Sequence, residues 1–346
     1  MNKDFRNERS IAVIGGGNGA GRTLSALHDN GDFISAIITT LDNGGSTGAL
    51  RERFGIPAMG DIRRAFVALA ENRELANLIG VRFSHAELCD SGLNEDIGHS
   101  FGNLALAAMF KLSGSFENAV DMASRLLRVR GEVIPVTLDV AHLRAIREDG
   151  VVIEGETNID VPEDDMGHLR ITDLKIVPTV AGNPKAVNAL LNARKIVVGP
   201  GDLYTSILPC LIIPEIRDAF VRSGADKIFV ANIMTKNGET PGYDVDDFVD
   251  EIGKYLRIQG HRVFDRIVVN SAVLPDRLLH RYAIEHSHPV KVRVNSKLRD
   301  KMVYFPLYEE GDEYAYHGID ALREVLSHIV GSKVSRSPEL SLVASN

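Results

Sequence analysis

The sequence contains no tryptophan and only two cysteines, Cys89 and Cys210, among its 346 residues. The two cysteines are far apart and lack the close spacing of metal-ligand pairs. This argues against a disulfide framework and against a cysteine-based metal centre. We expect two buried thiols in a reducing compartment.

Long apolar runs are also missing. No stretch of about 18 consecutive apolar residues occurs, and the first ten residues, MNKDFRNERS, lack the apolar segment of a secretory signal. The sequence therefore predicts no membrane-spanning segment, and we expect a cytoplasmic protein.

An excess of positive charge is absent as well. The 39 lysines and arginines are outnumbered by 47 aspartates and glutamates, which gives a formal net charge of -8. Because nothing attracts polyanions globally, we expect neither nucleic acid nor a membrane surface as a partner. An anionic ligand would have to be held by local backbone N–H groups and a few arginines.

Glycine is plentiful, with 31 residues, many of them in a few turns. Residues 11–14 form an apolar run that ends in the glycine turn 15–21, and a helical pattern follows. Residues 34–40 are rich in isoleucine and threonine and predict the next strand. Together these segments predict a right-handed βαβ unit with parallel strands.

The rest of the chain continues this alternation with additions. Residues 61–130 are expected to be mainly helical, and residues 131–178 to form short strands with polar turns. The pattern of strand followed by helix resumes at residues 183–206, 227–233 and 266–270. We predict an α/β fold, a Rossmann-like, doubly wound and mostly parallel sheet with helical and small β elaborations. It is expected to be one domain over residues 10–330, with a disordered polar tail at 331–346.

The first glycine turn is the strongest local signal for a ligand. In parallel sheets, ligands bind beyond the carboxyl ends of the strands, where helix N-termini present free N–H groups. The spacing Gly15-x-Gly17-x-x-Ala20 fits the dinucleotide fingerprint, and the overlapping stretch from Gly16 nearly fits a P-loop, with Arg22 in place of lysine. The alternative is a turn that only packs its helix on the strand. The expected phosphate-binding residues are Gly15, Gly16, Gly17, Asn18 and Gly19.

A second glycine-rich loop follows the second strand. Asp42 stands where a dinucleotide fold carries an acidic residue for ribose hydroxyls. However, it leads into Asn43, Gly44, Gly45 and Ser46, a loop rich in hydrogen-bond donors. Two such loops at one sheet edge favour a phosphorylated sugar or a nucleotide diphosphate, and they disfavour a nicotinamide dehydrogenase. The alternative is a mobile surface turn.

Asp61 has two interpretations. It is well placed to cap the following helix. Alternatively, Asp42 and Asp61 converge on a magnesium ion that bridges phosphates, since Mg²⁺ takes one or two carboxylates together with ligand oxygens. Arg51 and Arg63 follow the same loops and are expected either to pair with phosphate through two hydrogen bonds or to lie solvated on the surface.

Three more segments are predicted to reach the same edge. A glycine and a side-chain amide before the helix at 101–112 suit recognition of a base or sugar. The turn at 199–206 repeats the strand, glycine turn and helix, with hydroxyls that bind phosphate or only cap the helix. The remaining candidate ligand residues are Gly102, Asn103, Gly199, Gly201, Thr205, Ser206 and Asn232. Catalysis by His99 and Ser100 is disfavoured because neighbours in a chain do not face each other and no nucleophile elbow surrounds the serine.

Six motifs, in order over residues 10–330, resemble those of a known family. They are IAVIGGGNGAGR, TTLDNGGSTGALR, GDIRRAFVAL, GHSFGNLALAA, VVGPGDLYTSILP and NIMTKNGETPGY. The chain resembles the 2-phospho-L-lactate transferase-like family, in particular its bacterial branch of UDP-sugar-binding gluconeogenesis factors. Asn18 departs from the family pattern, in which threonine is common at this position.

The resemblance implies a regulatory factor that binds a nucleotide sugar, such as UDP-N-acetylglucosamine, and acts in carbon metabolism and cell shape. It also implies an alternative, a Mg²⁺-dependent transferase that moves a phospholactyl-type group from a nucleotide diphosphate donor to a hydroxyl acceptor. The catalytic candidates are then Asp42 and Asp61. A homodimer is a further expectation from the family.

Overall fold

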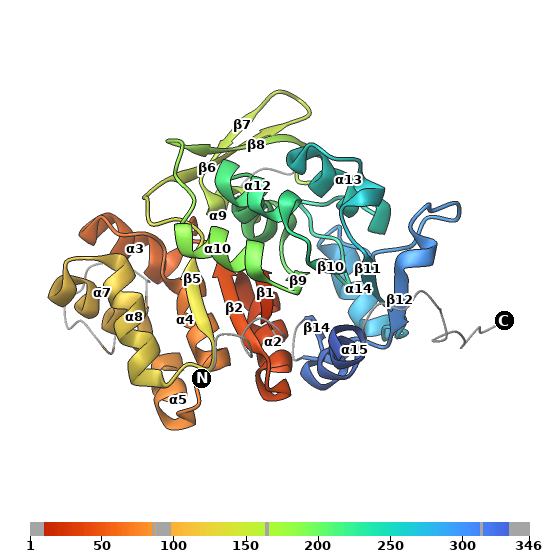
Figure 1. Cartoon of the computed structure of the whole chain (residues 1–346). Coiled ribbons are helices and arrows are strands. Elements are labelled where there is room, and N and C mark those ends of the chain that lie inside the picture. The colour runs from red at the N-terminus through yellow and green to blue at the C-terminus, as the bar shows by residue number, and fades with distance from the viewer. Residues whose placement is uncertain (1–9, 85–86, 88–97, 163–165, 312–313, 332–346) are drawn as a thin grey trace.

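A seven-stranded parallel sheet forms the centre of the molecule (Figure 1). The computed structural model describes residues 10–84, 87, 98–162, 166–311 and 314–331. The sheet order is β12-β11-β10-β9-β1-β2-β5, and every neighbouring pair is parallel. The strands are β1 (Ser10–Gly15), β2 (Phe33–Ile38), β5 (Glu132–Pro135), β9 (Lys195–Val198), β10 (Asp226–Val230), β11 (Arg266–Asn270) and β12 (Met302–Phe305).

This strand order creates a natural binding crevice. If the seven strands are numbered in the order in which they occur in the chain, their order across the sheet from β5 is 3-2-1-4-5-6-7. Doubly wound dinucleotide-binding folds have the same kind of order. The direction of the order reverses between β1 and β9, which pair through Ile11↔Lys195 to Ile14↔Val198. Ligands of such sheets bind beyond the carboxyl ends of the two strands at this reversal.

Helices cover both faces of the sheet, because its central strands are apolar on both sides. Along β1, Ile11 and Val13 belong to one core, whereas Ala12 and Ile14 belong to the other. The first core is completed by α2 (Gly17–Leu27), α3 (Gly45–Phe54), α4 (Gly60–Leu69), α5 (Arg73–Gly80), α7 (Phe101–Ser113), α8 (Phe116–Leu127), α14 (Asp276–Ile284) and α15 (Ile319–Gly331). The second core is completed by α10 (Pro184–Asn192), α11 (Leu208–Leu211), α12 (Pro214–Arg222) and α13 (Val245–Leu256).

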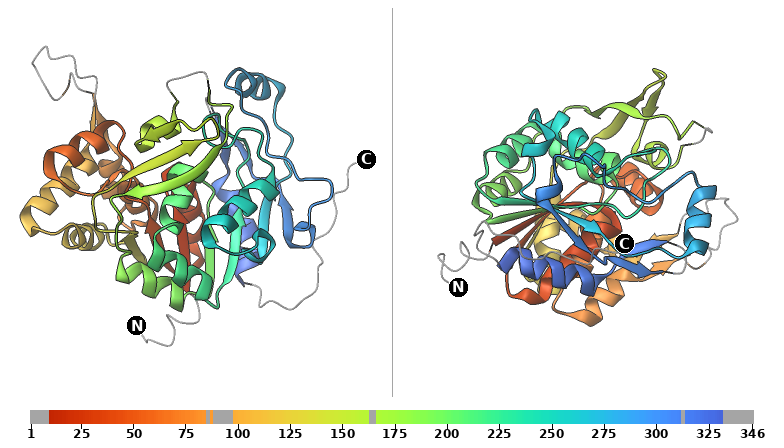
Figure 2. Two further views of the ribbon diagram at one scale, coloured as in Figure 1. Left: turned by 90° about the horizontal axis from the view of Figure 1, so that it is seen from above. Right: turned by 90° about the vertical axis from the view of Figure 1, so that its right-hand side faces the viewer.

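Smaller elements are added at the edges. Figure 2 shows a yellow-green antiparallel sheet that projects beyond the central one, in the order β7-β6-β8. Its strands are β6 (His142–Arg147), β7 (Val152–Glu154) and β8 (Ile171–Val177), and the short helix α9 (Glu156–Asp160) follows β7. Two hairpins pair β3 (Arg82–Phe83) with β4 (His99–Ser100) and β13 (Tyr308–Glu310) with β14 (Ala315–His317).

The predicted fold class is confirmed, with two local corrections. The second glycine-rich stretch is a loop only up to Gly44, because α3 begins at Gly45. The prediction of Asp61 as a helix cap is wrong, since Met59 is the N-cap of α4 and no side chain caps that helix.

Some predictions remain untested. Cys89 and residues 332–346 of the expected tail lie outside the described residues, while Gly331 ends α15. The single domain over residues 10–330 stays a prediction. No helix among the described residues is long and apolar enough to span a bilayer.

Candidate functional site

The first glycine turn and the turn after β9 lie against each other at the reversal of strand order. A Cβ atom on Gly19 would overlap the carbonyl oxygen of Pro200, and one on Gly201 would lie 3.7 Å from the carbonyl oxygen of Gly16. Gly17 adopts a φ of 63°, which favours glycine. Glycine is therefore required here for close backbone approach as well as for the turn itself.

The N-terminus of α2 presents free donors at this point. Gly16 is the N-cap and no side chain caps the helix, while the Ala20 N–H donates to the Gly16 carbonyl at 3.3 Å. The N–H groups of Gly17, Asn18 and Gly19 donate no hydrogen bond to any described residue. Free amides and the positive end of the helix dipole together attract an anion.

The second loop leads to another open helix N-terminus. The Gly44 N–H donates to Asp42 Oδ1 at 2.7 Å, which folds the loop back on itself. Gly44 is the N-cap of α3, again without a side-chain cap. In the described part of the chain, the N–H groups of Gly45, Ser46 and Thr47 have no acceptor. The two glycine-rich loops thus each end in unpaired helix amides.

A buried polar contact connects α3 to α7. Asn103 Nδ2 donates to Ser46 Oγ at 3.1 Å, and Ser46 Oγ also lies 2.9 Å from His99 Nδ1. Asn103 Oδ1 is buried and has no partner among the described residues. Because an unpaired buried carbonyl oxygen is costly, this atom is a strong candidate for contact with a donor on a ligand.

Three carboxyl groups gather between the two loops. A Cβ atom on Gly16 would overlap Asp61 Oδ2, and one on Gly60 would lie 3.2 Å from Asp42 Oδ2. Burial raises the pKa of Asp42, and the neighbouring Asp61 raises it further, although the Gly44 N–H opposes the rise. Burial, with the charge of Asp42, also raises the pKa of Glu156 to about 9. Asp42 and Glu156 are therefore poorly compensated as anions.

Two carboxyl groups of this set, those of Asp42 and Asp61, are candidate ligands for a divalent cation. Asp61 is 7% exposed, and its other oxygen pairs with Arg64. The Thr47 hydroxyl adjoins Gly60, where a Cβ atom would lie 2.6 Å from Thr47 Oγ1. Mg²⁺ prefers oxygen ligands and is usually bound by one or two carboxylates. A bound ion would also remove the repulsion between the two carboxylates. Asp42 and Asp61 are the residues that would hold it.

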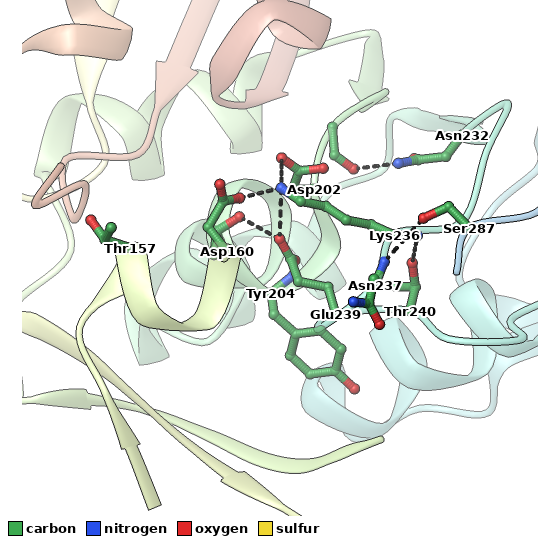
Figure 3. Close-up of polar contacts among 12 residues, drawn as sticks. Thr157, Asp160, Asp202, Tyr204, Asn232, Lys236, Asn237, Glu239, Thr240 and Ser287 are labelled. Carbon is green, nitrogen blue, oxygen red and sulfur yellow. Dashed lines mark hydrogen bonds and ion pairs between the residues drawn. The ribbon is translucent and has the colours of Figure 1, made fainter. Parts of the chain in front are cut away.

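A lysine neutralises a second acidic group at the same rim (Figure 3). Lys236 Nζ pairs with Asp160, lies 2.9 Å from Asp202 and 3.5 Å from Glu239. Burial opposes its charge, but the carboxylates raise its pKa overall. Burial raises the pKa of Glu239 to about 8, against the effect of Lys236. The three carboxylates have the spacing of a metal site, yet the ammonium group already lies among them.

The turn after β9 offers fewer free groups than the sequence predicts. Glu239 accepts hydrogen bonds from the Tyr204 N–H at 2.7 Å and from Thr205 Oγ1 at 2.9 Å. The Ser206 N–H donates to the Asp202 carbonyl at 2.9 Å. The Ser206 side chain instead faces the first turn, because a Cβ atom on Gly16 would lie 3.3 Å from its hydroxyl oxygen.

The other predicted residues divide between the site and its surroundings. Asn232 Nδ2 donates to the Gly201 carbonyl at 3.0 Å, and its buried Oδ1 has no partner in the described structure. Arg51 donates to the carbonyls of Leu41, Asp42 and Ala141, so it supports the second loop and is not free for phosphate. Gly102 lies against Arg63, whose Cδ would be 2.6 Å from a Cβ atom there.

Asn43 and Gly199 contact other parts of the fold and hold their turns in place. Asn43 Oδ1 accepts from the N–H of Thr157 at 2.9 Å and from its hydroxyl at 3.1 Å. Gly199 has a φ of 76° and packs against the Val230 carbonyl. The second loop is thus attached to α9, and the third turn to β10.

Sequence reasoning missed four residues of this site: Glu156, Asp160, Lys236 and Glu239. The motif NIMTKNGETPGY contains Lys236 and Glu239, and its cluster of polar residues after β10 was a signal for them. Nothing local distinguishes Glu156 and Asp160, which α9 brings to the rim from the small sheet.

Comparisons with known proteins show which family the chain resembles. Residues 11–305 match the family model described as 2-phospho-L-lactate transferase CofD. The chain is 37% identical over 281 residues to a protein of Bacillus subtilis named "Gluconeogenesis factor", covering 81% of this chain and 84% of that one. A protein of the same name from Halalkalibacterium halodurans is 36% identical over 285 residues, which is 82% of this chain and 84% of that one.

A solved structure is similar over nearly its whole length. It is an X-ray structure of a Bacillus halodurans protein, with a TM-score of 0.82 and 33% sequence identity. The similarity covers 94% of this chain and 99% of that one.

Proposed function

The chain belongs to the 2-phospho-L-lactate transferase CofD family, and we propose that it is a regulatory factor that binds a nucleotide sugar. The proposed ligand is a UDP-sugar resembling UDP-N-acetylglucosamine, and the proposed role lies in carbon metabolism and cell shape. Its relatives named gluconeogenesis factor support the link to carbon metabolism.

One observation carries this proposal. Two helices, α2 and α3, begin at glycine N-caps with no side-chain cap, beyond the carboxyl ends of the neighbouring strands β1 and β2. Their unpaired amides would hold the pyrophosphate. The orphan oxygens of Asn103 and Asn232, both buried, would accept hydrogen bonds from the sugar or the base.

A thermal-unfolding assay tests the proposal. UDP-N-acetylglucosamine, UDP, GDP and NAD are each added with and without Mg²⁺. A ligand at about 100 times its dissociation constant stabilises the folded state by about 2.7 kcal/mol. We expect the UDP-sugar to give the largest shift. A shift with NAD alone would contradict the proposal.

The alternative, a Mg²⁺-dependent transferase, is favoured by a different observation. The Asp42 carboxylate lies beside Gly60, and its charge interacts with that of Asp61. A bound Mg²⁺ would neutralise charge on the pyrophosphate during transfer. The free amides of α2 and α3 would orient the donor, and the acceptor hydroxyl would attack its outer phosphorus as the bond to the nucleotide breaks. Turnover of a nucleotide diphosphate donor that is lost in a folded Asp61→Asn variant would establish this activity.

A further inference from the structure

A cavity of about 380 Å³ lies beside the first glycine turn, between α2, α4 and β14. Asn18 and Ser25 line it from α2, and Tyr316 lines it from β14. Three arginines also line it: Arg22, Arg63 and Arg64. The volume is at the lower end of the range for small-molecule sites, which is about 300–1,000 Å³.

Two of the three arginines have carboxylate partners. Arg22 Nη1 lies 2.5 Å from Glu309 Oε2 and donates to the His317 carbonyl at 3.0 Å. Its guanidinium also stacks 4.7 Å from the centre of the Tyr316 ring. Arg64 pairs with Asp61. Both side chains therefore already have an acceptor for their guanidinium groups.

Arg63 has no such partner. Its Nε is buried, and the Arg63 side chain makes no hydrogen bond or ion pair with the described residues. Burial and the like charges of Arg64 and Arg82 lower its pKa to about 10, although Asp61 acts in the opposite direction. A buried charge is costly unless it is paired. The Arg63 guanidinium lines a polar cavity and would gain from an anionic partner there.

We propose that this cavity binds the phosphoryl group of a small phosphorylated metabolite, with Arg63 as its principal contact. The guanidinium fork matches phosphate oxygens through two parallel hydrogen bonds. A dianion also relieves the repulsion among Arg63, Arg64 and Arg82, which a single negative charge would do only in part. The Asn18 amide and the Ser25 hydroxyl are neutral polar neighbours, and the Tyr316 ring offers a surface for the carbon skeleton.

This site goes beyond the nucleotide site, because it extends along α2 from Asn18 to Ser25, whereas the nucleotide site lies at the N-terminus of that helix. The nucleotide would be held by the backbone amides at the helix N-terminus, whereas the second ligand would be held by side chains along the helix. Asn18 contributes its backbone to the first site and lines the second. The protein would then bind two metabolites on one helix.

Isothermal titration with inorganic phosphate, at constant ionic strength, tests the proposal. It is carried out with and without saturating UDP-N-acetylglucosamine, so that phosphate binding at the glycine turn is recognised by its loss when nucleotide is present. We expect phosphate to bind in both conditions, and Arg63→Gln to weaken the nucleotide-insensitive binding by about ten-fold or more. Arg63→Lys, which keeps the charge but loses the fork, should fall in between.

A matched control and a second variant complete the test. Arg222→Gln removes an exposed arginine at the end of α12 and should leave phosphate binding unchanged. If Arg63→Gln does not fold, Ser25→Met narrows the cavity without touching any arginine and should weaken phosphate binding as well. Unchanged binding in the folded variants, or no phosphate binding by the wild type in the presence of nucleotide, would overturn the proposal.

The outcomes also separate this inference from the proposed function. If UDP-N-acetylglucosamine does not bind but phosphate binding depends on Arg63, the cavity is supported and the nucleotide-sugar proposal fails. If the nucleotide sugar binds and phosphate does not, the nucleotide-sugar proposal is supported and the proposal for the cavity fails.

Discussion

The side-chain amide nitrogen of Asn103 lies 3.1 Å from the hydroxyl oxygen of Ser46, so the first turn of α7 is connected to the first turn of α3. The two residues are 57 positions apart in the chain. Ser46 is 3% exposed and Asn103 is 2% exposed. This contact holds the second glycine-rich loop against the segment that begins α7, and it leaves Asn103 Oδ1 without a partner.

The first prediction concerns that oxygen. Asn103→Ala removes an acceptor that we expect a nucleotide sugar to use, and the affinity for UDP-N-acetylglucosamine should fall by about ten-fold. Asn30→Ala is the matched control, because the Asn30 amide makes only an exposed contact with Ser327. Isothermal titration measures both. Equal affinities of the two variants for UDP-N-acetylglucosamine would show that Asn103 does not contact the ligand.

The second prediction compares two glycines of one helix. Gly19→Ala brings a methyl group into the backbone of Pro200, which cannot move aside as a flexible side chain would. We expect the free energy of unfolding to fall by about 2 kcal/mol or more. In Gly21→Ala the methyl group meets nothing within 4 Å, and stability should rise by about 0.5 kcal/mol. Urea unfolding of both variants measures the difference, and similar values would show that the two turns are not tightly packed.

The third prediction concerns pH and Mg²⁺. The pKa of Glu156 is raised from 4.5 to about 9, so between these values the native state binds more protons than the unfolded state. Without divalent cations, the free energy of unfolding should therefore fall as the pH rises through this window. Glu156→Gln should make the dependence shallower, whereas Glu154→Gln, which removes an exposed partner of Arg144, should not.

Added Mg²⁺ should change this behaviour, because a cation binds the deprotonated carboxylates. We expect its stabilising effect to increase from pH 6 to pH 9 in the wild type. Thermal unfolding across pH, with and without Mg²⁺, measures it. An effect of Mg²⁺ that does not vary with pH would contradict the proposal that Asp42 and Asp61 hold the ion beside Glu156.

The fourth prediction concerns Lys236. Lys236→Met leaves Asp160, Asp202 and Glu239 without their shared cation, and unfolding should become easier by about 3 kcal/mol. Adding Glu239→Gln to this variant should cost less than the two separate changes together, because the residues share one network. Lys254→Met, which removes an exposed partner of Glu251, should cost less than about 1 kcal/mol. Strict additivity would show that Lys236 and Glu239 are independent.

The fifth prediction concerns His317. Its Nε2 lies 2.9 Å from the Ala231 carbonyl, and burial lowers its pKa from 6.5 to about 4. The native state then binds fewer protons than the unfolded state between these values, so stability should be lost as the pH falls through this window, by about 3 kcal/mol in total. In His317→Gln this part of the acid sensitivity should disappear. His280→Gln, at an exposed position, should keep it.

The parts of the site that are encoded locally could be predicted from the sequence. Residues 15–19 follow an apolar strand and precede a helix, so their position at the sheet edge follows from the pattern alone. The same holds for Gly199 and Gly201 after β9. Helix α3 was not predicted, because glycine is a poor helix former and three glycines lie in its first turn and N-cap. Burial of Leu50 and the contacts of Arg51 hold it in place.

The side chains that come from distant segments could not be predicted. Glu156 and Asp160 reach the rim because α9 packs there. Lys236 lies near Glu239, three residues along the chain, and near Asp160 and Asp202 from two distant segments. The spacing of residues along the chain does not indicate which distant side chains will meet in the fold. Asp61 was expected either to cap a helix, because aspartate is a frequent N-cap, or to bind Mg²⁺. The N-cap of α4 is instead Met59, two residues earlier, and the Asp61 carboxylate lies toward Gly16.

Helix α9 has a consequence for how the family can vary in evolution. It has five residues, yet Thr157 holds Asn43 at one end and Asp160 holds Lys236 at the other. Strands β6, β7 and β8 can accept insertions and deletions at their outer turns without disturbing these two attachments. A change in the length of α9 itself would displace one of them. Among related sequences we expect loop lengths in the small sheet to diverge freely while the spacing from Thr157 to Asp160 stays fixed.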